Sequence, residues 1–213
     1  MDYLGKRNDY GQQALTEAEL VSDPIRQFSI WLGEAEQAGI FEPNAFVLGT
    51  IGADGKPSAR TVLLRGVDDA GFYFYTNYES RKGQAIVHGA SVSMVFGWYP
   101  QFRQVLVEGV AEKVETSEND AYFNTRPRDS QLSAWASNQS QPIESRDDLE
   151  ERYENRRAEF AARDIPRPEF WGGYRIVPLR IEFWKGRSNR LHDRIVFTRA
   201  SADSEWTIQR LQP

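Results

Sequence analysis

Basic side chains stand beside aromatic or hydroxyl residues at several places in the sequence. Arg60 and Arg65 bracket a short apolar run, and Arg81 with Lys82 follows the aromatic segment 72–76. Most of the 26 basic residues are arginine, whose planar guanidinium binds phosphate or carboxylate through two parallel hydrogen bonds. These residue types indicate pockets for a small phosphorylated ligand. The alternative, for most of the arginines, is a scattered and solvated surface position.

The segment around Arg81 has the features of an anion site. Ser80 is a possible N-cap of a helix at residues 81–88, and the N–H groups at a helix N-terminus attract negative charge. Arg81 and Lys82 would add two positive charges there, which suits a phosphate. The alternative is an aromatic core strand followed by an ordinary solvated first turn.

A second anion site is indicated by the sequence RPRDSQ at residues 126–131, between two predicted helices. Tyr122 precedes Arg126 by four residues, so both lie on one helical face, and together with Ser130 they could hold a second phosphate. The alternative is a capping loop in which Asp129 or Ser130 caps the next helix.

The C-terminal part combines aromatic and basic residues. FWGG at residues 170–173 precedes a strand that ends near Trp184, and RLHDR follows at residues 190–194. An exposed aromatic ring can stack on a planar ligand, and alternate residues of RLHDR share one face of a regular strand. His192 beside Asp193 is more often a structural hydrogen-bonded pair than a catalyst, but its arginine neighbours make a ligand site equally plausible.

The elements that position these residues follow from hydrophobic periodicity. A helix beginning at Pro24, capped by Ser22 or Asp23, is predicted to run until Gly39. Further helices are predicted at residues 81–88, 117–125, 130–136 and 147–162, and strands at residues 45–51, 58–64, 72–76, 91–98, 103–114, 173–184, 194–199 and 206–211. Strands that resume after helices predict a mainly β, α+β fold: a closed or split antiparallel β-barrel with outer helices.

Composition and length exclude several classes of protein. The 213 residues suggest one domain, residues 21–213, preceded by a polar, mobile N-terminal arm at residues 1–20. The absence of cysteine and the presence of only two histidines exclude disulfides, thiolate catalysis and a zinc cluster, so no metal is expected. No apolar stretch approaches 20 residues and no signal peptide is evident, so we expect a soluble, cytoplasmic protein that binds no membrane. A net charge of −5 argues against nucleic acid.

Taken in order, these segments resemble the pyridoxamine 5'-phosphate oxidase family from about residue 7 to the C-terminus. The most specific parts are RPRDSQ, FWGG and RLHDR, supported by YTN at residues 75–77 and SRK at residues 80–82. The resemblance implies an FMN-binding split β-barrel that works as a homodimer with shared active sites, and a C-terminal dimerisation and substrate region at about residues 171–213. It also implies FMN-dependent oxidation of pyridoxine 5'-phosphate and pyridoxamine 5'-phosphate to pyridoxal 5'-phosphate. O2 would be the acceptor, with H2O2 as a product, and NH3 would be released from the amine.

The resemblance also assigns residues by position. The implied FMN-binding residues are Arg60, Thr61, Val62, Leu63, Leu64, Arg65, Tyr75, Thr76, Arg81, Lys82, Gln104, Gln139, Ser140, Trp184 and Arg194. The implied substrate-binding residues are Arg7, Asn8, Asp9 and Tyr10 of a closing N-terminal segment, Tyr122, Arg126 and Ser130 around the phosphate, Arg190 and His192 over the ring, and also Arg65 and Leu191. Arg65 stands where the family usually has lysine.

Arg190 and His192 are the implied catalytic residues, which would orient the substrate ring and help to manage the proton of its alcohol or amine group. A flavin is required in this reaction because no side chain can accept a hydride. Two other functions remain open: a same-fold FMN oxidase of the phenazine-biosynthesis type, and a non-catalytic protein that binds FMN or pyridoxal phosphate. Turnover with O2 separates an enzyme from a carrier.

Overall fold

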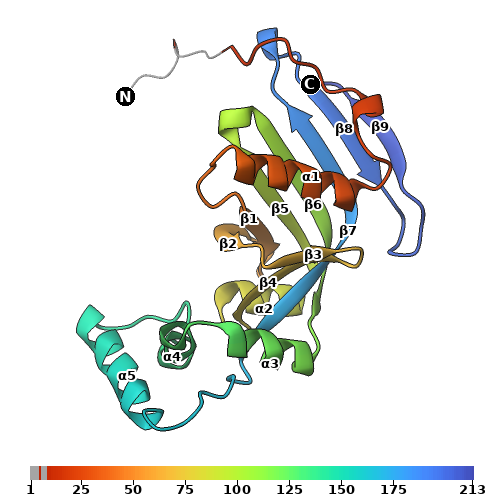
Figure 1. Ribbon diagram of the computed structural model, residues 1–213. Helices are drawn as coiled ribbons and strands as arrows, with labels where there is room; N and C mark the ends of the chain where they lie inside the picture. Colours follow the sequence, from red (N-terminus) through yellow and green to blue (C-terminus); the bar gives the residue numbers. More distant parts are fainter. Residues whose placement is uncertain (1–4, 6–8) are drawn as a thin grey trace.

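The protein is described by a computed structural model that covers residue 5 and residues 9–213 (Figure 1). Within these residues, nine antiparallel strands form one curled sheet. The strands are β1 (Ala45–Ile51), β2 (Pro57–Leu63), β3 (Gly66–Asp68), β4 (Gly71–Asn77), β5 (Ser91–Trp98), β6 (Arg103–Lys113), β7 (Trp171–Lys185), β8 (Asp193–Thr198) and β9 (Thr207–Leu211). Their order is β2-β1-β5-β6-β7-β4-β3, with β8 and β9 added beside β7.

The sheet divides along the long strand β7. One edge of β7 pairs with β6 at residues 174–185, whereas the other edge pairs first with β4 at residues 171–176 and then with β8 at residues 180–185. Pro178 lies between the two halves, next to a bulge opposite Glu108 and Gly109. Proline has no N–H to donate, so it suits a position where β7 leaves one neighbour and has not reached the next.

Helix α1 (Pro24–Gln37) lies across the curled sheet (Figure 1). Asp23 caps it by accepting hydrogen bonds from the N–H groups of Ile25 (2.8 Å) and Arg26 (3.4 Å). Its apolar side packs into the main core, where Phe28 contacts Phe72, Phe96 and Trp98 through tilted or edge-on rings. This helix therefore seals one face of the barrel, as its spacing predicts.

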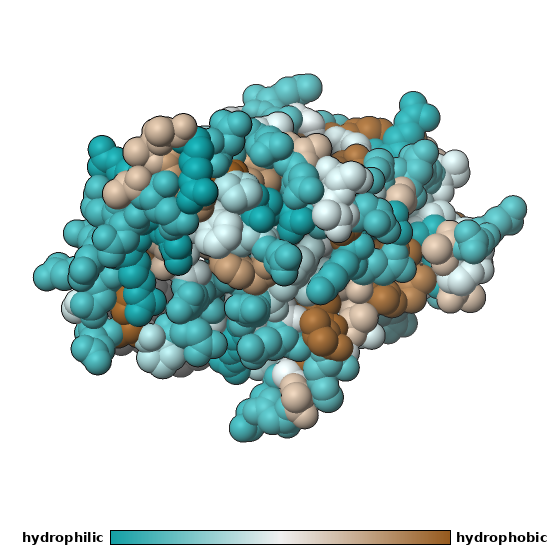
Figure 2. All heavy atoms as spheres, turned by 90° about the horizontal axis from the view of Figure 1, so that it is seen from below, coloured by the Kyte–Doolittle hydropathy of each residue, from teal (hydrophilic) through white to brown (hydrophobic). Residues whose placement is uncertain are grey.

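The other helices gather at the opposite end of the molecule. They are α2 (Arg81–His88), α3 (Thr116–Thr125), α4 (Arg128–Ala136) and α5 (Arg146–Glu159). A second, smaller core of Phe123, Leu132, Phe160, Ile165 and Trp171 joins α3, α4 and the start of β7. Seen from this end, the surface is mostly hydrophilic with separate hydrophobic areas (Figure 2).

The predicted helices and strands are present, with small differences at their ends. The structure adds β3, begins β7 two residues earlier, at Trp171, and ends α5 three residues earlier, at Glu159. The alternative of a capping loop before α4 is wrong, because Pro127 occupies the N-cap and neither Asp129 nor Ser130 caps the helix. Ser80 does cap α2, by accepting a hydrogen bond from the Gly83 N–H.

The sequence predicts a polar, mobile N-terminal arm, but its described part contacts the core and the C-terminal strands. Leu15 is buried in the main core, and its N–H donates to the Asp193 carboxylate at 2.9 Å. Asp193 also accepts a hydrogen bond from Arg210 near the C-terminus, and Arg210 in turn binds both Glu17 and the Leu15 carbonyl. From Asp9 onward the arm therefore packs on the chain's own C-terminal strands, through long-range partners that local composition does not reveal. The division into residues 1–20 and 21–213 stays a prediction.

Replacing Asp193 with alanine is expected to lower the free energy of unfolding by about 2 kcal/mol, because a buried N–H that loses its acceptor costs about 1 to 3 kcal/mol, whereas Arg210 keeps its ion pair with Glu17. Leu15 and Arg210 would both lose an acceptor that is only 8% exposed. Urea unfolding measures the change, with Asp69→Ala on the exposed β3–β4 turn as the control. Equal stability of the two variants would contradict the role given to Asp193.

Candidate functional site

Three basic side chains meet near the start of α2. Arg60 extends from β2, and its Nη1 donates to the Leu48 carbonyl (3.0 Å) and to Thr50 Oγ1 (2.8 Å), while its Nη2 donates to Ser58 Oγ (2.5 Å). Burial and the nearby charge of Arg81 both lower the pKa of Arg60. The guanidinium is thus held in place entirely by neutral acceptors and keeps its charge available.

Lys82 completes this cation cluster, which we define as Arg60, Arg81 and Lys82. Its Nζ donates to Thr76 Oγ1 at the end of β4 (3.1 Å) and to Gln139 Oε1 in the loop after α4 (2.5 Å). Burial, and then the charge of Arg60, lower the pKa of Lys82 to about 8. The Lys82 ammonium group therefore joins the end of β4, six residues before it, to the loop after α4, 57 positions away.

The cation cluster has the properties of an anion site. Across the described residues, none of its three side chains forms an ion pair with a carboxylate, although most other arginines of the protein do. Arg81 and Lys82 lie at the capped N-terminus of α2, whose N–H groups add positive potential, and the charge of Arg60 acts on Lys82. Like charges this close are unfavourable without a counter-charge, which a phosphate group supplies.

A second cluster is built from stacked aromatic rings and Arg126. Tyr75 of β4 stacks on Tyr122 of α3 at a centroid distance of 3.7 Å, and the Tyr122 ring is parallel to that of Trp171 at 6.1 Å. Arg126 lies over Trp171, with its Cζ 4.4 Å from the ring centroid. Its Nη1 is buried and has no hydrogen-bond partner in the described structure. Such a buried, unpaired donor is costly unless a ligand accepts from it.

Arg65 belongs to this second cluster rather than to the strand that carries Arg60. Strand β2 ends at Leu63, so Arg65 lies beyond the strand that carries Arg60. The Arg65 N–H instead donates to the Tyr73 carbonyl, and the charge of Arg65 contributes to the lowered pKa of Arg126, behind burial. Ser130 lies in the first turn of α4, four residues beyond Arg126.

A third cluster lies where the arm meets the loop before β8. The ring of His192 is 4.7 Å from that of Trp184 and 5.6 Å from that of Tyr10. His192 Nδ1 accepts a hydrogen bond from the Arg187 N–H at 3.0 Å. In the neutral imidazole this leaves the proton on Nε2, so the free ring nitrogen is a donor. Burial, and then Arg190, lower the pKa of His192, which favours this neutral form.

The RLHDR segment is not the single strand face that alternation suggested. Strand β8 begins only at Asp193, and Arg190 ends a short 3-10 turn with a positive φ of 61°. Asp193 binds the arm and Arg210 instead of His192, so the predicted His192–Asp193 pair is wrong. Long-range acceptors and donors decide these partners, which sequence neighbours do not indicate.

Three of the residues implied for FMN binding form a row beside the third cluster. Gln104 on β6 is paired with Trp184 on β7, which is paired with Arg194 on β8. All three nitrogens of the Arg194 guanidinium already have partners, two on Glu182 and one on the Gln212 carbonyl. This row stays a predicted ligand contact and is not part of the cation cluster in the same chain.

The remaining predicted residues are distributed between these clusters. Thr61, Val62 and Leu63 continue β2 beyond Arg60, Leu64 is buried in the main core, and Ser140 follows Gln139 with a positive φ of 72°. Asp9 accepts a hydrogen bond from Ser188, and Leu191 is 65% exposed beside His192. Arg7 and Asn8 lie outside the described residues.

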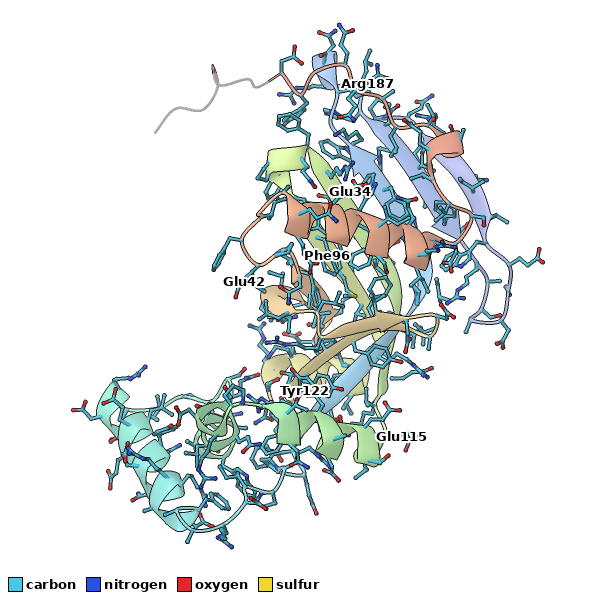
Figure 3. All side chains as sticks on the ribbon, in the orientation of Figure 1. Glu34, Glu42, Phe96, Glu115, Tyr122 and Arg187 are labelled. Carbon is cyan, nitrogen blue, oxygen red and sulfur yellow. The ribbon has the colours of Figure 1, made fainter. Side chains whose placement is uncertain are left out.

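The clusters occupy opposite ends of the protein. Tyr122 of the second cluster and Arg187 beside the third lie far apart, with the sheet and α1 between them (Figure 3). The predicted site residues therefore divide into two half-sites: the cation cluster with the Tyr122 and Arg126 group, and the Gln104 row with Tyr10, Arg190 and His192. One chain does not bring the two half-sites together.

The structure also adds residues that sequence reasoning missed. Thr50 and Ser58 hold the Arg60 guanidinium, and Trp171 supports Arg126. The FWGG pattern was a signal for Trp171, but only the packing of α3 on β7 connects it to Arg126.

Every helix of the described chain is too short or too polar to cross a membrane, and no group of acidic and histidine side chains in these residues is arranged to hold a metal ion.

Comparison with known proteins gives one family. Residues 32–158 match the family described as pyridoxamine 5'-phosphate oxidase, and residues 171–213 match the pyridoxine 5'-phosphate oxidase C-terminal dimerisation region. The chain is 53% identical to the pyridoxine/pyridoxamine 5'-phosphate oxidase of Rubrobacter xylanophilus over 212 residues, which cover 100% of this chain and 97% of that protein.

Solved structures give the same result. PhzG from Burkholderia lata, crystallised with tetrahydrophenazine-1-carboxylic acid, matches with a TM-score of 0.87 and 31% identity over 95% of this chain and 100% of that one. A pyridoxamine 5'-phosphate oxidase-related, FMN-binding protein from Nostoc punctiforme shares the fold with a TM-score of 0.71 and 14% identity, over 91% and 100%. The predicted split barrel with outer helices is confirmed. The chain is a member of the pyridoxine/pyridoxamine 5'-phosphate oxidase family.

Proposed function

We propose that this protein oxidises pyridoxine 5'-phosphate and pyridoxamine 5'-phosphate to pyridoxal 5'-phosphate, with FMN as cofactor and O2 as acceptor. Two relatives, 53% and 49% identical and each matched over 97% of its length, are named pyridoxine/pyridoxamine 5'-phosphate oxidase. The observation that carries the proposal is that two separate groups of basic side chains lack carboxylate partners in the described residues, one group for each of two phosphates.

The first group, the cation cluster, suits the phosphate of FMN. Arg60 and Lys82 are held by neutral oxygens of Thr50, Ser58, Thr76 and Gln139, so their charges are oriented without being cancelled. Arg81 adds a third charge at the start of α2. When bound, FMN supplies the chemistry that side chains lack, accepting a hydride from the substrate and passing the electrons to O2.

The second group suits the phosphate of the substrate. Arg126 has an unpaired buried Nη1, Tyr122 and Ser130 lie beside it in the chain, and Arg65 adds charge. A phosphate held here would receive charge-assisted hydrogen bonds, which are stronger than neutral ones. These residues would therefore bind and orient the substrate through a group remote from the reacting carbon.

Arg190 and His192 are proposed to act on the substrate ring. His192 presents Nε2–H as a donor, because the Arg187 N–H occupies Nδ1. It would donate a hydrogen bond from Nε2–H to the alcohol oxygen or amine nitrogen of the substrate and so orient that group. Arg190, which is exposed, would reach the ring from the same loop.

We also propose that the protein works as a homodimer in which each active site uses both subunits. The C-terminal segment matches a dimerisation region, and the two half-sites lie at opposite ends of one chain (Figure 3). The sheet face opposite α1 exposes Val47 and Ile51, and a hollow of about 760 Å³ is lined by β1, β2, β5, β6 and β7. A second copy on this face would join one half-site to the other.

The direct test is peroxide release by the purified protein, supplied with FMN and O2, on addition of pyridoxine 5'-phosphate. We expect release with the phosphate ester and little with unphosphorylated pyridoxine. A yellow protein that is silent with both would overturn the vitamin substrate. A same-fold oxidase would then be the better assignment, because PhzG shares the fold, or a carrier that binds FMN without turnover.

Mixing two variants that are each nearly inactive at low concentrations of pyridoxine 5'-phosphate tests whether the active site is shared. Arg126→Ala removes one half-site and Arg190→Ala the other, and Arg190→Ala is expected to lose turnover while retaining FMN. Unfolding and refolding equal amounts of the two together should make about half of the dimers hybrids. Each hybrid has one intact site and one doubly substituted site, so about a quarter of the wild-type activity should return. Peroxide release measures the recovery, and no recovery in a mixture shown to contain hybrid dimers would place both half-sites in one subunit.

The affinity for FMN is expected to fall as the pH rises from 7 to 9. The pKa of Lys82 lies near 8, so its ammonium is charged at pH 7 and mostly neutral at pH 9, while the FMN phosphate is a dianion throughout. At pH 9, one unit above the pKa, only about one tenth of the Lys82 side chains carry a charge. Binding that requires the charged form should therefore be about tenfold weaker than at pH 7. Flavin fluorescence titration measures it. Lys82→Arg should bind with no such fall, because a guanidinium stays charged, and a fall that persists in this variant would exclude Lys82 as its cause.

A further inference from the structure

We infer that Trp171 is a positioning residue for substrate phosphate, because its indole face holds Arg126 ready without neutralising it. The inference rests on the proposed function, in which Arg126 binds that phosphate, and it extends this function to a residue that is not among those assigned to FMN or substrate. The observations are the ring contact, the unpaired nitrogen and the absence of a carboxylate on Arg126 in the described chain.

The contact itself is close and specific. Arg126 Cζ lies 4.4 Å from the centroid of the Trp171 ring and 5.5 Å from that of Phe123. A cation over an aromatic face at this distance is attracted by the ring quadrupole, more strongly when it is desolvated, and tryptophan attracts it most strongly. Burial lowers the pKa of Arg126, which indicates that the guanidinium is partly desolvated. Trp171 therefore contributes a substantial part of what keeps Arg126 in this position.

The choice of partner has a chemical consequence. Arg194 and Arg210 are oriented by carboxylates, which accept from the guanidinium nitrogens and cancel the charge. An indole face accepts no in-plane N–H hydrogen bond, so it orients the cation and leaves the N–H groups of Arg126 for an incoming anion. The unpaired, buried Nη1 of Arg126 is the group that such an arrangement leaves available.

Trp171 is itself held firmly. Its carbonyl accepts a hydrogen bond from Arg167 Nη1 (2.7 Å), and Arg167 Nε also binds Asp120 of α3 (2.6 Å). Its ring is buried against Phe123 and is parallel to that of Tyr122. A residue fixed to both α3 and β7 can hold the arginine that follows α3 at a constant place.

The test compares Trp171→Leu and Trp171→Phe with Trp135→Leu as the matched control. Trp135 also has an arginine near its ring, Arg156 at 5.6 Å, but it lies on α4 outside both half-sites. Each FMN-loaded dimer is assayed by peroxide release with pyridoxine 5'-phosphate and, at high concentration, with unphosphorylated pyridoxine. Inhibition by inorganic phosphate reports on the phosphate site alone.

We expect Trp171→Leu to raise KM for the phosphate ester and the inhibition constant of inorganic phosphate about tenfold, with kcat and the pyridoxine reaction changed less than about twofold. Trp171→Phe should show a smaller rise of about threefold, since a phenyl ring holds a cation less well. In an Arg126→Ala background, Trp171→Leu should add nothing to the loss of phosphate binding.

Two results would overturn the inference. One is an equal loss with phosphorylated and unphosphorylated substrates, which would make Trp171 a packing residue only. The other is unchanged phosphate inhibition in Trp171→Phe, the variant that decides the matter if Trp171→Leu does not fold. Absence of turnover in the wild-type protein would instead refute the proposed function, so the two failures are distinguishable.

Discussion

Replacing Arg126 with leucine is expected to lower kcat/KM for pyridoxine 5'-phosphate about 100-fold. Arg126 offers a buried, unpaired Nη1 and carries no ion pair to a carboxylate in the described residues, so its loss removes hydrogen bonds that only the substrate phosphate uses. Hydrogen bonds to charged groups each contribute about 1.5 to 3 kcal/mol, which corresponds to a factor of about 10 to 150. Steady-state peroxide release measures the change.

Unphosphorylated pyridoxine provides the internal control for this prediction, since its slow oxidation does not depend on a phosphate site. Arg152→Leu on the exposed face of α5 removes an equal charge outside both half-sites and should have little effect. If Arg126→Leu slowed the two substrates by the same factor, Arg126 would be required for the fold or for the flavin and not for the phosphate.

The double variant Arg81→Met/Lys82→Met is expected to weaken FMN binding about 1,000-fold. Both substitutions remove a charge from the N-terminus of α2, where the cation cluster has no carboxylate partner within the described chain. Two charge-assisted hydrogen bonds together contribute about 3 to 6 kcal/mol, a factor of about 10² to 10⁴. Quenching of flavin fluorescence on titration gives the dissociation constant.

Riboflavin separates the phosphate contribution from the ring contribution in this experiment. It lacks the phosphate, so its weak binding should be the same in the wild-type protein and in the double variant. The matched control is Arg146→Met/Arg152→Met on α5, which removes two charges away from the cluster. Unchanged FMN affinity in the Arg81→Met/Lys82→Met protein would assign the cation cluster to another anion.

The separation of the half-sites gives the dimer a chemical role. Residues around the proposed phosphate sites come from β2, β4, α2 and α3, whereas Arg190 and His192 belong to the loop before β8 at the other end (Figure 1). In a monomer, the site that binds the cofactor and substrate phosphates would lack Arg190 and His192, the residues proposed to act on the substrate ring. Activity is therefore expected to depend on protein concentration wherever the dimer dissociates.

The sequence predicted the local elements because their signals are local. Asp23 before Pro24 and Ser80 before Arg81 are capping patterns, and both residues cap the helices that follow. Alternation and short apolar runs located the main strands, and only the three-residue strand β3 was too short to recognise. The resemblance of RPRDSQ, FWGG and RLHDR to one family was likewise a property of the sequence, and the comparisons confirm it.

Interactions between distant segments required the tertiary structure. Lys82 meets Gln139 across 57 positions, Asp193 binds Leu15 instead of His192, and Arg194 is paired with Glu182. None of these partners follows from spacing, because strand pairing and loop closure decide which polar groups meet once water is excluded.

The sequence by itself thus determined the elements, the family and the residue types able to bind two phosphates. The tertiary structure decided which of those cations remain unpaired, which nitrogen of His192 is a donor, and that Tyr122 and Arg187 lie at opposite ends (Figure 3). The physical reason is that helix and strand formation depend on neighbours within a few residues, whereas burial, charge pairing and hydrogen-bond partners depend on segments that meet only after folding.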